Sequence, residues 1–268
     1  MTAGAIRVGV GGWDFDPWRE TFYPAGLARA KQLDHASRRL TAIEINATYY
    51  KLQSPALFER WAKAVPDGFK FAVKASRFCS TRRVLAEGGE GIERFCGQGL
   101  TALGDRLGPI LWQFMATKKF EPDDFAAFLK LLPRKQDGVP LHHAIEVRHE
   151  SFRDPAFVAM CRAAGVAIVF GDGEGFPLVP DISGGLVYAR LMRAEAALEQ
   201  GYKAQTLDKW AGVARQWAAG ESPAGFPYLA EPAPVEPRET YVFFIASAKE
   251  RNPAAAVALI ERLRSAGA

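Results

Sequence analysis

Eight short apolar segments recur along the chain, and amphipathic segments of helical periodicity separate most of them. Each apolar segment is rich in Val, Ile or Phe and is bounded by Gly, Pro or charge, as expected of parallel strands buried on both faces. This alternation predicts an α/β fold, a single (β/α)8 TIM-type barrel with a closed parallel sheet, and a doubly wound open sheet is the alternative. The predicted strands are 6–12, 42–47, 69–75, 109–114, 144–148, 166–171, 186–191 and 241–246.

The segments between these strands carry apolar residues at near-helical spacing. Two helix starts are marked by a capping residue followed by proline, at Ser54-Pro55 and at Asn252-Pro253. The interval between Gly171 and Leu186 leaves little room for a long helix. The predicted helices are 25–40, 54–65, 91–107, 122–132, 154–164, 205–219 and 253–263.

The length of 268 residues fits one barrel, for which about 250 residues are typical, although two small domains would also fit. We assign residues 1–268 to one barrel domain. Its one compositional break is the segment 221–239, which contains five prolines. Because this insertion joins a helix to the next strand, we expect it on the amino-terminal face or the flank of the barrel, away from the catalytic face.

Charge and cysteine content restrict the partners and the compartment. Lys and Arg number 34 and Asp and Glu number 30, so the net charge of +4 permits an anionic ligand without demanding nucleic acid. The chain has no run of about 18 apolar residues, which predicts no membrane span, and its first residues lack the pattern of a signal peptide. Three cysteines without a C-x-x-C pair fit the reducing cytosol, so we predict a cytoplasmic protein.

Polar residues recur at the carboxyl ends of the predicted strands, where TIM barrels carry their active sites. Glu44 and Asn46 lie two residues apart and so point to the same side of their strand, as do Glu146 and Arg148. A carboxylate inside an apolar strand requires a partner, and the set supplies three cations. The candidate residues are Trp13, Glu44, Asn46, Lys74, Gln113, Glu146, Arg148, His149, Asp172 and Arg190.

We interpret this set as a polar pocket with both signs of charge, and a buried ion-pair network that only holds the barrel mouth is the alternative. In the pocket, Glu44 or Glu146 is the predicted general acid or base, and the other carboxylate is kept ionised by a cation. The remaining candidates are predicted to bind substrate. Lys74, Arg148 and Arg190 are predicted to pair with the charge of the substrate. Asn46 and Gln113 are predicted to orient the substrate, and Trp13 to stack on it.

The sequence therefore predicts an enzyme that acts on a phosphorylated or carboxylated small molecule, as a hydrolase, a lyase or an isomerase. A non-catalytic binding module for an anionic ligand is the alternative, and nucleic-acid binding through the basic rim is a third hypothesis. Side chains of metal-binding type occur among the candidates, but they form no clustered motif and have basic neighbours, so we predict no metal and no cofactor. Neither a G-x-G-x-x-G fingerprint nor a P-loop is present.

Several motifs carry a family resemblance that covers nearly the whole chain. They are Gly9-Val-Gly-Gly-Trp13, Trp18, Phe22-Tyr-Pro24, Glu44-Ile-Asn46-Ala-Thr48-Tyr-Tyr50, Trp61, Phe69-Lys-Phe-Ala-Val-Lys74, Leu107-Gly-Pro-Ile-Leu111-Trp-Gln113, Glu146-Val-Arg148-His149-Glu-Ser151 and Arg190. With these motifs the chain resembles the YecE-like family, domain of unknown function 72. The resemblance implies a TIM-type barrel and no particular reaction, because the activity of the family is not established.

The chain departs from the pattern of that family after three strands. Ser80-Thr81 replace a Thr-His pair, Met192-Arg193 replace a His-Gly pair, and Ile245-Ala246-Ser247 replace an Asn-Asn or Asn-Asp pair. We therefore expect a subgroup with an altered substrate or with weakened catalysis.

Overall fold

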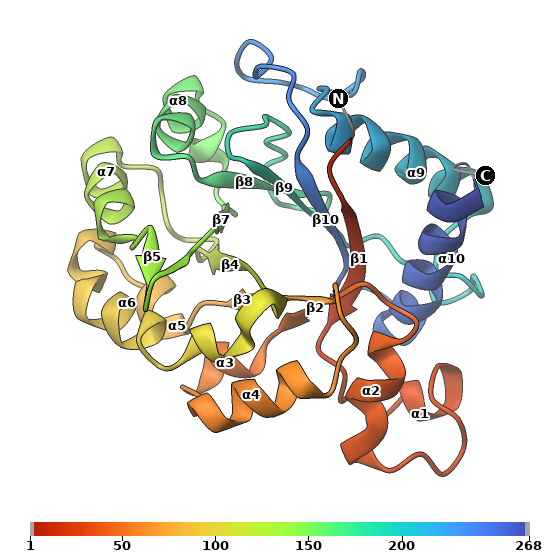
Figure 1. The fold of residues 1–268 in the computed structure, drawn as a ribbon. Helices are drawn as coiled ribbons and strands as arrows, with labels where there is room; N and C mark the ends of the chain where they lie inside the picture. The colour runs from red at the N-terminus through yellow and green to blue at the C-terminus, as the bar shows by residue number, and fades with distance from the viewer. Residues whose placement is uncertain (1–2, 266–268) are drawn as a thin grey trace.

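Eight parallel strands close into a barrel in the computed structural model, which describes residues 3–265 (Figure 1). The ends of the predicted domain, residues 1–2 and 266–268, lie outside the described residues. The closed barrel is confirmed, and the open-sheet alternative is wrong. In order around the barrel the strands are β1 (Ile6–Gly11), β10 (Glu239–Phe244), β9 (Leu186–Leu191), β8 (Ala167–Gly171), β7 (His143–Glu146), β4 (Leu107–Gln113), β3 (Lys70–Lys74) and β2 (Ala42–Ile45).

Helices surround this sheet, and a small hairpin of β5 (Lys135–Gln136) and β6 (Val139–Pro140) precedes β7. None of the helices in the described part of the chain has the length and apolarity of a segment that crosses a membrane. The helices are α1 (Trp18–Thr21), α2 (Gln32–Ser37), α3 (Ala47–Tyr50), α4 (Pro55–Lys63), α5 (Arg77–Ser80), α6 (Gly89–Cys96), α7 (Pro122–Leu131), α8 (Pro155–Ala164), α9 (Ala204–Ala219) and α10 (Asn252–Ser265), with 3₁₀ turns at Arg29–Lys31, Leu85–Gly88, Leu100–Arg106, Glu150–Phe152 and Lys249–Arg251.

Three predicted helices differ from the observed ones. The segment 25–40 forms only a 3₁₀ turn followed by α2. The segment 91–107 divides into α6 and a 3₁₀ turn, because Gly99 adopts a left-handed conformation with φ of 101°. Ser54 caps α4 by accepting the N–H of Leu57, whereas Asn252 lies inside α10 after a 3₁₀ turn and does not cap it.

Side chains inside the barrel alternate with side chains that face the helices. One apolar cluster fills the barrel interior, and it includes Ala42, Ala72, Leu111, Ala144 and Tyr188. A residue two positions later points to the same side, so the next inward positions are held by Glu44, Lys74, Gln113, Glu146 and Arg190. The apolar interior therefore ends, at the carboxyl end of five strands, in a layer of polar side chains.

The connection between β8 and β9 contains no helix among residues 172–185, unlike the other long crossovers. Part of the proline-rich segment 221–238 lies against this connection instead. The N–H groups of Leu229 and Ala230 donate to the carboxylate of Asp181, and Arg238 donates to the carbonyl of Gly184, just before β9. The segment thus packs on the amino-terminal end and the flank of the barrel, and its Phe226 reaches Phe170 near the carboxyl end of β8.

Gly9 is required where β1 meets β2, since a Cβ at this position would lie 1.8 Å from the carbonyl oxygen of Ala42. Gly9→Ala is expected to lower the free energy of unfolding by about 3 kcal/mol, or to prevent folding, because the backbone cannot move aside inside a closed sheet. Gly212, within α9, has open space around its Cβ position. Gly212→Ala is expected to raise stability by about 0.5–1 kcal/mol. Urea denaturation of both variants tests these two predictions. An unchanged denaturation midpoint for Gly9→Ala would contradict the role of Gly9.

Candidate functional site

The guanidinium of Arg190 lies between two buried carboxylates at the carboxyl end of the barrel. Its Nη2 and Nε atoms donate to Oε1 and Oε2 of Glu44, each at 3.1 Å, and its Nη1 donates to Glu146. The side chains of these three residues are between 0% and 4% exposed. One guanidinium thus forms ion pairs with two carboxylates that come from β2 and β7, on different sides of the barrel.

Three further side chains satisfy the remaining oxygen atoms of the carboxylates. Tyr188 donates its hydroxyl proton to Glu44 at 2.7 Å. Gln113 donates to both oxygens of Glu146, at 3.1 and 3.0 Å, and Nε of Arg148 donates to Oε1 of Glu146 at 2.7 Å. We name Glu44, Gln113, Glu146, Arg148, Tyr188 and Arg190 the mouth network. Its buried charges are paired and hydrogen-bonded, which is the condition for keeping them out of water.

The charges in the mouth network set its protonation states. Burial raises the pKa of Glu146, but the charges of Arg190 and Arg148 and the hydrogen bond from Gln113 outweigh burial and lower this pKa to about 2. Burial lowers the pKa of Arg190, whereas the charges of Glu146 and Glu44 raise it, and the net pKa is raised. Burial and the neighbouring charge of Glu44 raise the pKa of Tyr188. Near neutral pH, Glu146 is therefore ionised and Tyr188 is a hydrogen-bond donor.

Lys74 lies beside the mouth network and is only partly buried. Its Nζ atom lies 4.3 Å from the centre of the Tyr49 ring, and within residues 3–265 it has no hydrogen-bond partner. Burial lowers the pKa of Lys74 to about 8, although the charge of Glu44 acts in the opposite direction. An amine with this pKa exists in both its charged and its neutral form near physiological pH.

Asn46 completes one side of the site, because its amide nitrogen donates to the backbone carbonyl of Glu44 at 3.3 Å. Gly11 leaves the space for this amide, since a Cβ there would lie 3.0 Å from Nδ2 of Asn46 and 4.0 Å from Oε1 of Glu44. Gly9 and Gly11 of β1 thus allow a neighbouring strand and a neighbouring side chain to approach closely.

Three predicted site residues make their contacts elsewhere. Trp13 packs edge-on against Trp61 of α4 at 5.3 Å between ring centroids, within the layer between sheet and helices. His149 accepts the N–H of Ser151 and so caps a 3₁₀ turn. Asp172 accepts the N–H of Met192 and lines a separate pocket beside β8.

Two residues of the site were not among the sequence candidates. Tyr188 holds the inward position two residues before Arg190, so the alternation of the strand could have indicated it. Phe176 lies below the guanidinium of Arg148, which is 4.5 Å from its ring centroid. Phe176 comes from an irregular connection, and no periodic pattern marks it.

The site carries a small positive charge that a ligand could neutralise. The cations Lys74, Arg148 and Arg190 and the carboxylates Glu44 and Glu146 leave a net charge of +1, three minus two, when the amine is protonated. Within residues 3–265 no three side chains of His, Cys, Asp or Glu gather in a group that could hold a metal ion. The arrangement suits a small anion, because Lys74 and the two Nη groups of Arg148 make no hydrogen bond to the described residues.

Comparison with known proteins gives one consistent family. A family model described as "Protein of unknown function DUF72" matches residues 7–268. The UPF0759 protein YunF of Bacillus subtilis is 26% identical over 158 residues, which cover 57% of this chain and 54% of that protein. The UPF0759 protein YecE of Escherichia coli K12 is 27% identical over 149 residues, which cover 55% and 50%. These matches span about half the length of each relative.

A solved structure agrees with this comparison at the level of the fold. The crystal structure of a DUF72 family protein from Thermotoga maritima superposes with a TM-score of 0.74 at 23% identity, covering 97% of this chain and 99% of that chain. At this level of identity, the likeness shows a common fold.

Replacing Glu146 by Gln should reduce the loss of stability in acid. The pKa of Glu146 in the folded protein, about 2, lies below its usual value of 4.5. The stabilisation linked to this pKa is present above pH 4.5 and is lost as the pH falls from 4.5 toward 2. Wild type should lose on the order of 3 kcal/mol more than Glu146→Gln over this range.

Urea denaturation at a series of pH values measures the difference. Glu90, which is exposed on α6, provides the control, and Glu90→Gln should follow the wild-type profile. Parallel profiles for wild type and Glu146→Gln would contradict the assignment of Glu146 as a buried, ionised partner of Arg190.

Proposed function

The chain belongs to the DUF72 family of proteins of unknown function, and we propose that it is an enzyme that acts on a small anionic substrate at the carboxyl end of its barrel. The observation that carries this proposal is the contrast between the buried mouth network and the cationic groups beside it. Arg190 donates its hydrogen bonds to two carboxylates, whereas Lys74 and the Nη groups of Arg148 remain available to bind a ligand. A network that only held the strands together would not need further cations at its open side.

Arg148 is well placed to bind a phosphate or a carboxylate. Glu146 holds its Nε atom, and the ring of Phe176 supports the face of the guanidinium. A planar fork fixed in this way can donate two parallel hydrogen bonds to an oxyanion. Asn46 and Gln113 carry the amide groups that would orient the substrate.

The chemical step needs a group that exchanges a proton near neutral pH, and Lys74 is the best candidate. Its pKa of about 8 lets it act as a base when neutral and as an acid when charged. Glu146, with a pKa of about 2, remains ionised and positions the two arginines. Glu44 supplies the negative charge that favours the protonated amine. Hydrolysis, elimination and isomerisation all use proton transfer of this kind.

The proposal predicts anion binding that depends on Arg148 and on pH. Inorganic phosphate should bind to wild type in isothermal titration calorimetry, and Arg148→Ala should bind it at least about tenfold more weakly. Affinity should fall as the pH rises through about 8, because Lys74 then loses its proton. Lys70, at the opposite end of the same strand, is the control, and Lys70→Ala should bind phosphate as wild type does.

Turnover separates an enzyme from a binding module. A panel of sugar phosphates and hydroxy acids, followed by NMR, should contain a compound that wild type converts and that Lys74→Ala does not. Binding without conversion of any compound would favour the non-catalytic module. Absence of binding, combined with a more stable Glu146→Gln variant, would favour the ion-pair network as a purely structural feature.

A second candidate function, nucleic-acid binding, is favoured by one surface. Tyr50 and Phe78 are 65% and 61% exposed, and both line a hollow of about 530 Å³ with Arg82 and Arg94. The hollow adjoins the turns that follow β2 and β3. Exposed rings interleaved with cations suit stacked bases and phosphates.

A single-stranded oligonucleotide tests this candidate. Binding of a fluorescent oligo-dT, measured by anisotropy, should weaken at least about tenfold when Tyr50 and Phe78 are both replaced by Ala, since each stacked base contributes about 1–3 kcal/mol. The affinity of wild type should fall steeply with salt. Equal affinity of the double variant and wild type would dismiss this surface as a nucleic-acid site.

A further inference from the structure

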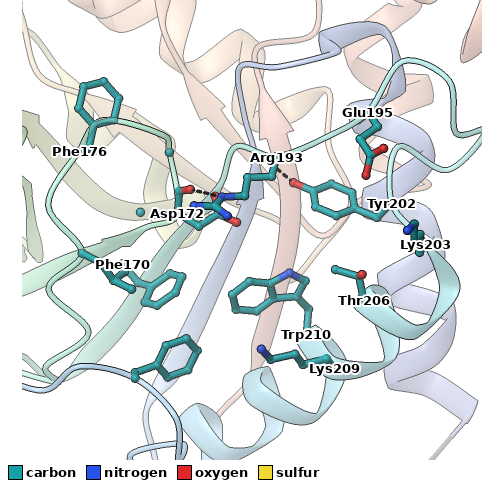
Figure 2. A pocket seen from close by; sticks show the side chains of 14 residues that line it. Phe170, Asp172, Phe176, Arg193, Glu195, Tyr202, Lys203, Thr206, Lys209 and Trp210 are labelled. Atoms are coloured by element: carbon teal, nitrogen blue, oxygen red, sulfur yellow. Dashed lines mark hydrogen bonds between the residues drawn. The ribbon is translucent and has the colours of Figure 1, made fainter.

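A pocket separate from the mouth network lies on the flank of the barrel, where the crossover from β8 to β9 lacks a helix. It has a volume of about 400 Å³ and extends between β8 and the first half of α9 (Figure 2). Since no helix covers β8 here, the outward ring of Phe170 meets α9 and the proline-rich segment directly. The pocket is thus a consequence of the missing helix and not part of the mouth network.

Aromatic rings form the apolar wall of this pocket. Phe170 contacts Trp210 at 5.6 Å and Phe226 at 5.1 Å between ring centroids, and Trp210 and Phe226 lie nearly parallel, with 16° between their planes. Phe226 belongs to the proline-rich segment, so this insertion contributes directly to the pocket. A wall of this kind favours a flat ligand that can stack.

Two mostly buried side chains present polar groups with unused hydrogen-bonding capacity to the pocket. Trp210 is 8% exposed, yet its indole N–H has no acceptor among residues 3–265. In Figure 2 the indole nitrogen is on the side of the ring nearer Tyr202 and Arg193. Tyr202 is 7% exposed, and its oxygen accepts the N–H of Arg193 at 2.9 Å, while its own proton has no acceptor in the described part of the chain. Both groups are donors that a ligand oxygen would satisfy.

Cations surround the open side of the same pocket. Arg193, Lys203 and Lys209 outnumber the carboxylates of Asp172 and Glu195, three to two, so the lining carries a net charge of +1. Helix α9 begins at Ala204 without a side-chain cap, and its 16 residues add the positive end of a helix dipole at this point. Arg193, Lys203 and the Tyr202 hydroxyl therefore lie toward one side of the pocket, whereas Lys209 lies on the aromatic side, with its Nζ atom 6.0 Å from the centroid of the Phe226 ring.

We propose that this pocket binds a small planar aromatic anion, with its ring against Trp210 and Phe226 and its carboxylate or phosphate group toward Lys203 and Tyr202. Phe176 separates the pocket from the mouth network, because its ring faces the guanidinium of Arg148 and also lines the pocket. The pocket is a site of its own, and the proposal does not depend on a reaction at the mouth.

The test uses salicylate and phenyl phosphate as probes, and inorganic phosphate and benzyl alcohol as the two half-probes. Binding is followed by the ¹H–¹⁵N signal of the Trp210 indole, which Trp210→Phe identifies by its loss. Salicylate or phenyl phosphate should shift this signal saturably, and neither half-probe should do so at the same concentration. An equal response to benzyl alcohol, or no response to either aromatic anion at millimolar concentration, would overturn the proposal.

Charge variants keep the test independent of the buried tryptophan. Lys203 and Lys209 are exposed, so their replacement should leave the fold intact. Lys203→Glu combined with Lys209→Glu should weaken binding of the aromatic anion at least about tenfold. Lys31→Glu combined with Lys63→Glu, two exposed changes away from the pocket, alters the net charge equally and is the matched control.

Lys74→Ala separates this pocket from the proposed active site, since Lys74 does not line the pocket. The variant should bind the aromatic anion as wild type does, even though it should bind phosphate more weakly at the mouth. Loss of the aromatic anion in Lys74→Ala, or unchanged affinity in the double lysine variant, would overturn the pocket assignment without affecting the proposed function.

Discussion

The carboxyl end of the barrel depends on one interaction, the double ion pair that Arg190 forms with Glu44 and Glu146. Glu44 and Glu146 approach each other across the barrel because a guanidinium lies between them. Removal of Arg190 would leave Glu44 buried without a paired cation and would leave Glu146 paired with Arg148 alone. Loss of one partner of a buried ion pair costs several kcal/mol in other proteins. The same arginine connects β2, β7 and β9, so the charges that fill the mouth also hold the barrel closed at this end. Glu146 also fixes the position of Arg148 by accepting a hydrogen bond from its Nε atom. The same network therefore orients the Nη groups of Arg148, which are free to bind a ligand.

The missing helix between β8 and β9 has a second set of consequences. A barrel strand without a covering helix exposes an apolar face, here represented by Phe170, and that face must be buried by something else. Helix α9 supplies Trp210, and the proline-rich segment supplies Phe226. Prolines stiffen such a segment at little entropic cost on folding. Trp210 and Phe226 fill the space over Phe170 less completely than a helix would, and the space that remains is the flank pocket.

The mouth and the flank pocket use cations in different ways. At the mouth, most charges are buried, paired and fixed by hydrogen bonds, and one lysine is partly desolvated. At the flank pocket, Lys203 and Lys209 are exposed, whereas Phe170 and Trp210 of the aromatic wall are buried. The first arrangement suits chemistry, which needs charges in fixed positions. The second suits binding of a ligand by stacking and by charge attraction.

The sequence by itself determined the barrel and most of its strand positions, because apolar runs and helical spacing are local properties that survive without knowledge of the partners. It also placed Glu44, Lys74, Gln113, Glu146 and Arg190 at strand ends, since inward and outward positions alternate along each strand. Only the tertiary structure decided that one arginine would pair with both carboxylates, because Arg190 and Glu44 are 146 residues apart in the chain. It also directed Trp13, His149 and Asp172 to other contacts and brought Phe226 to Phe170. The short interval between Gly171 and Leu186 already indicated the absent helix. Contacts between loops, and between residues on opposite sides of a barrel, depend in addition on how the sheet closes, and no local pattern encodes that closure.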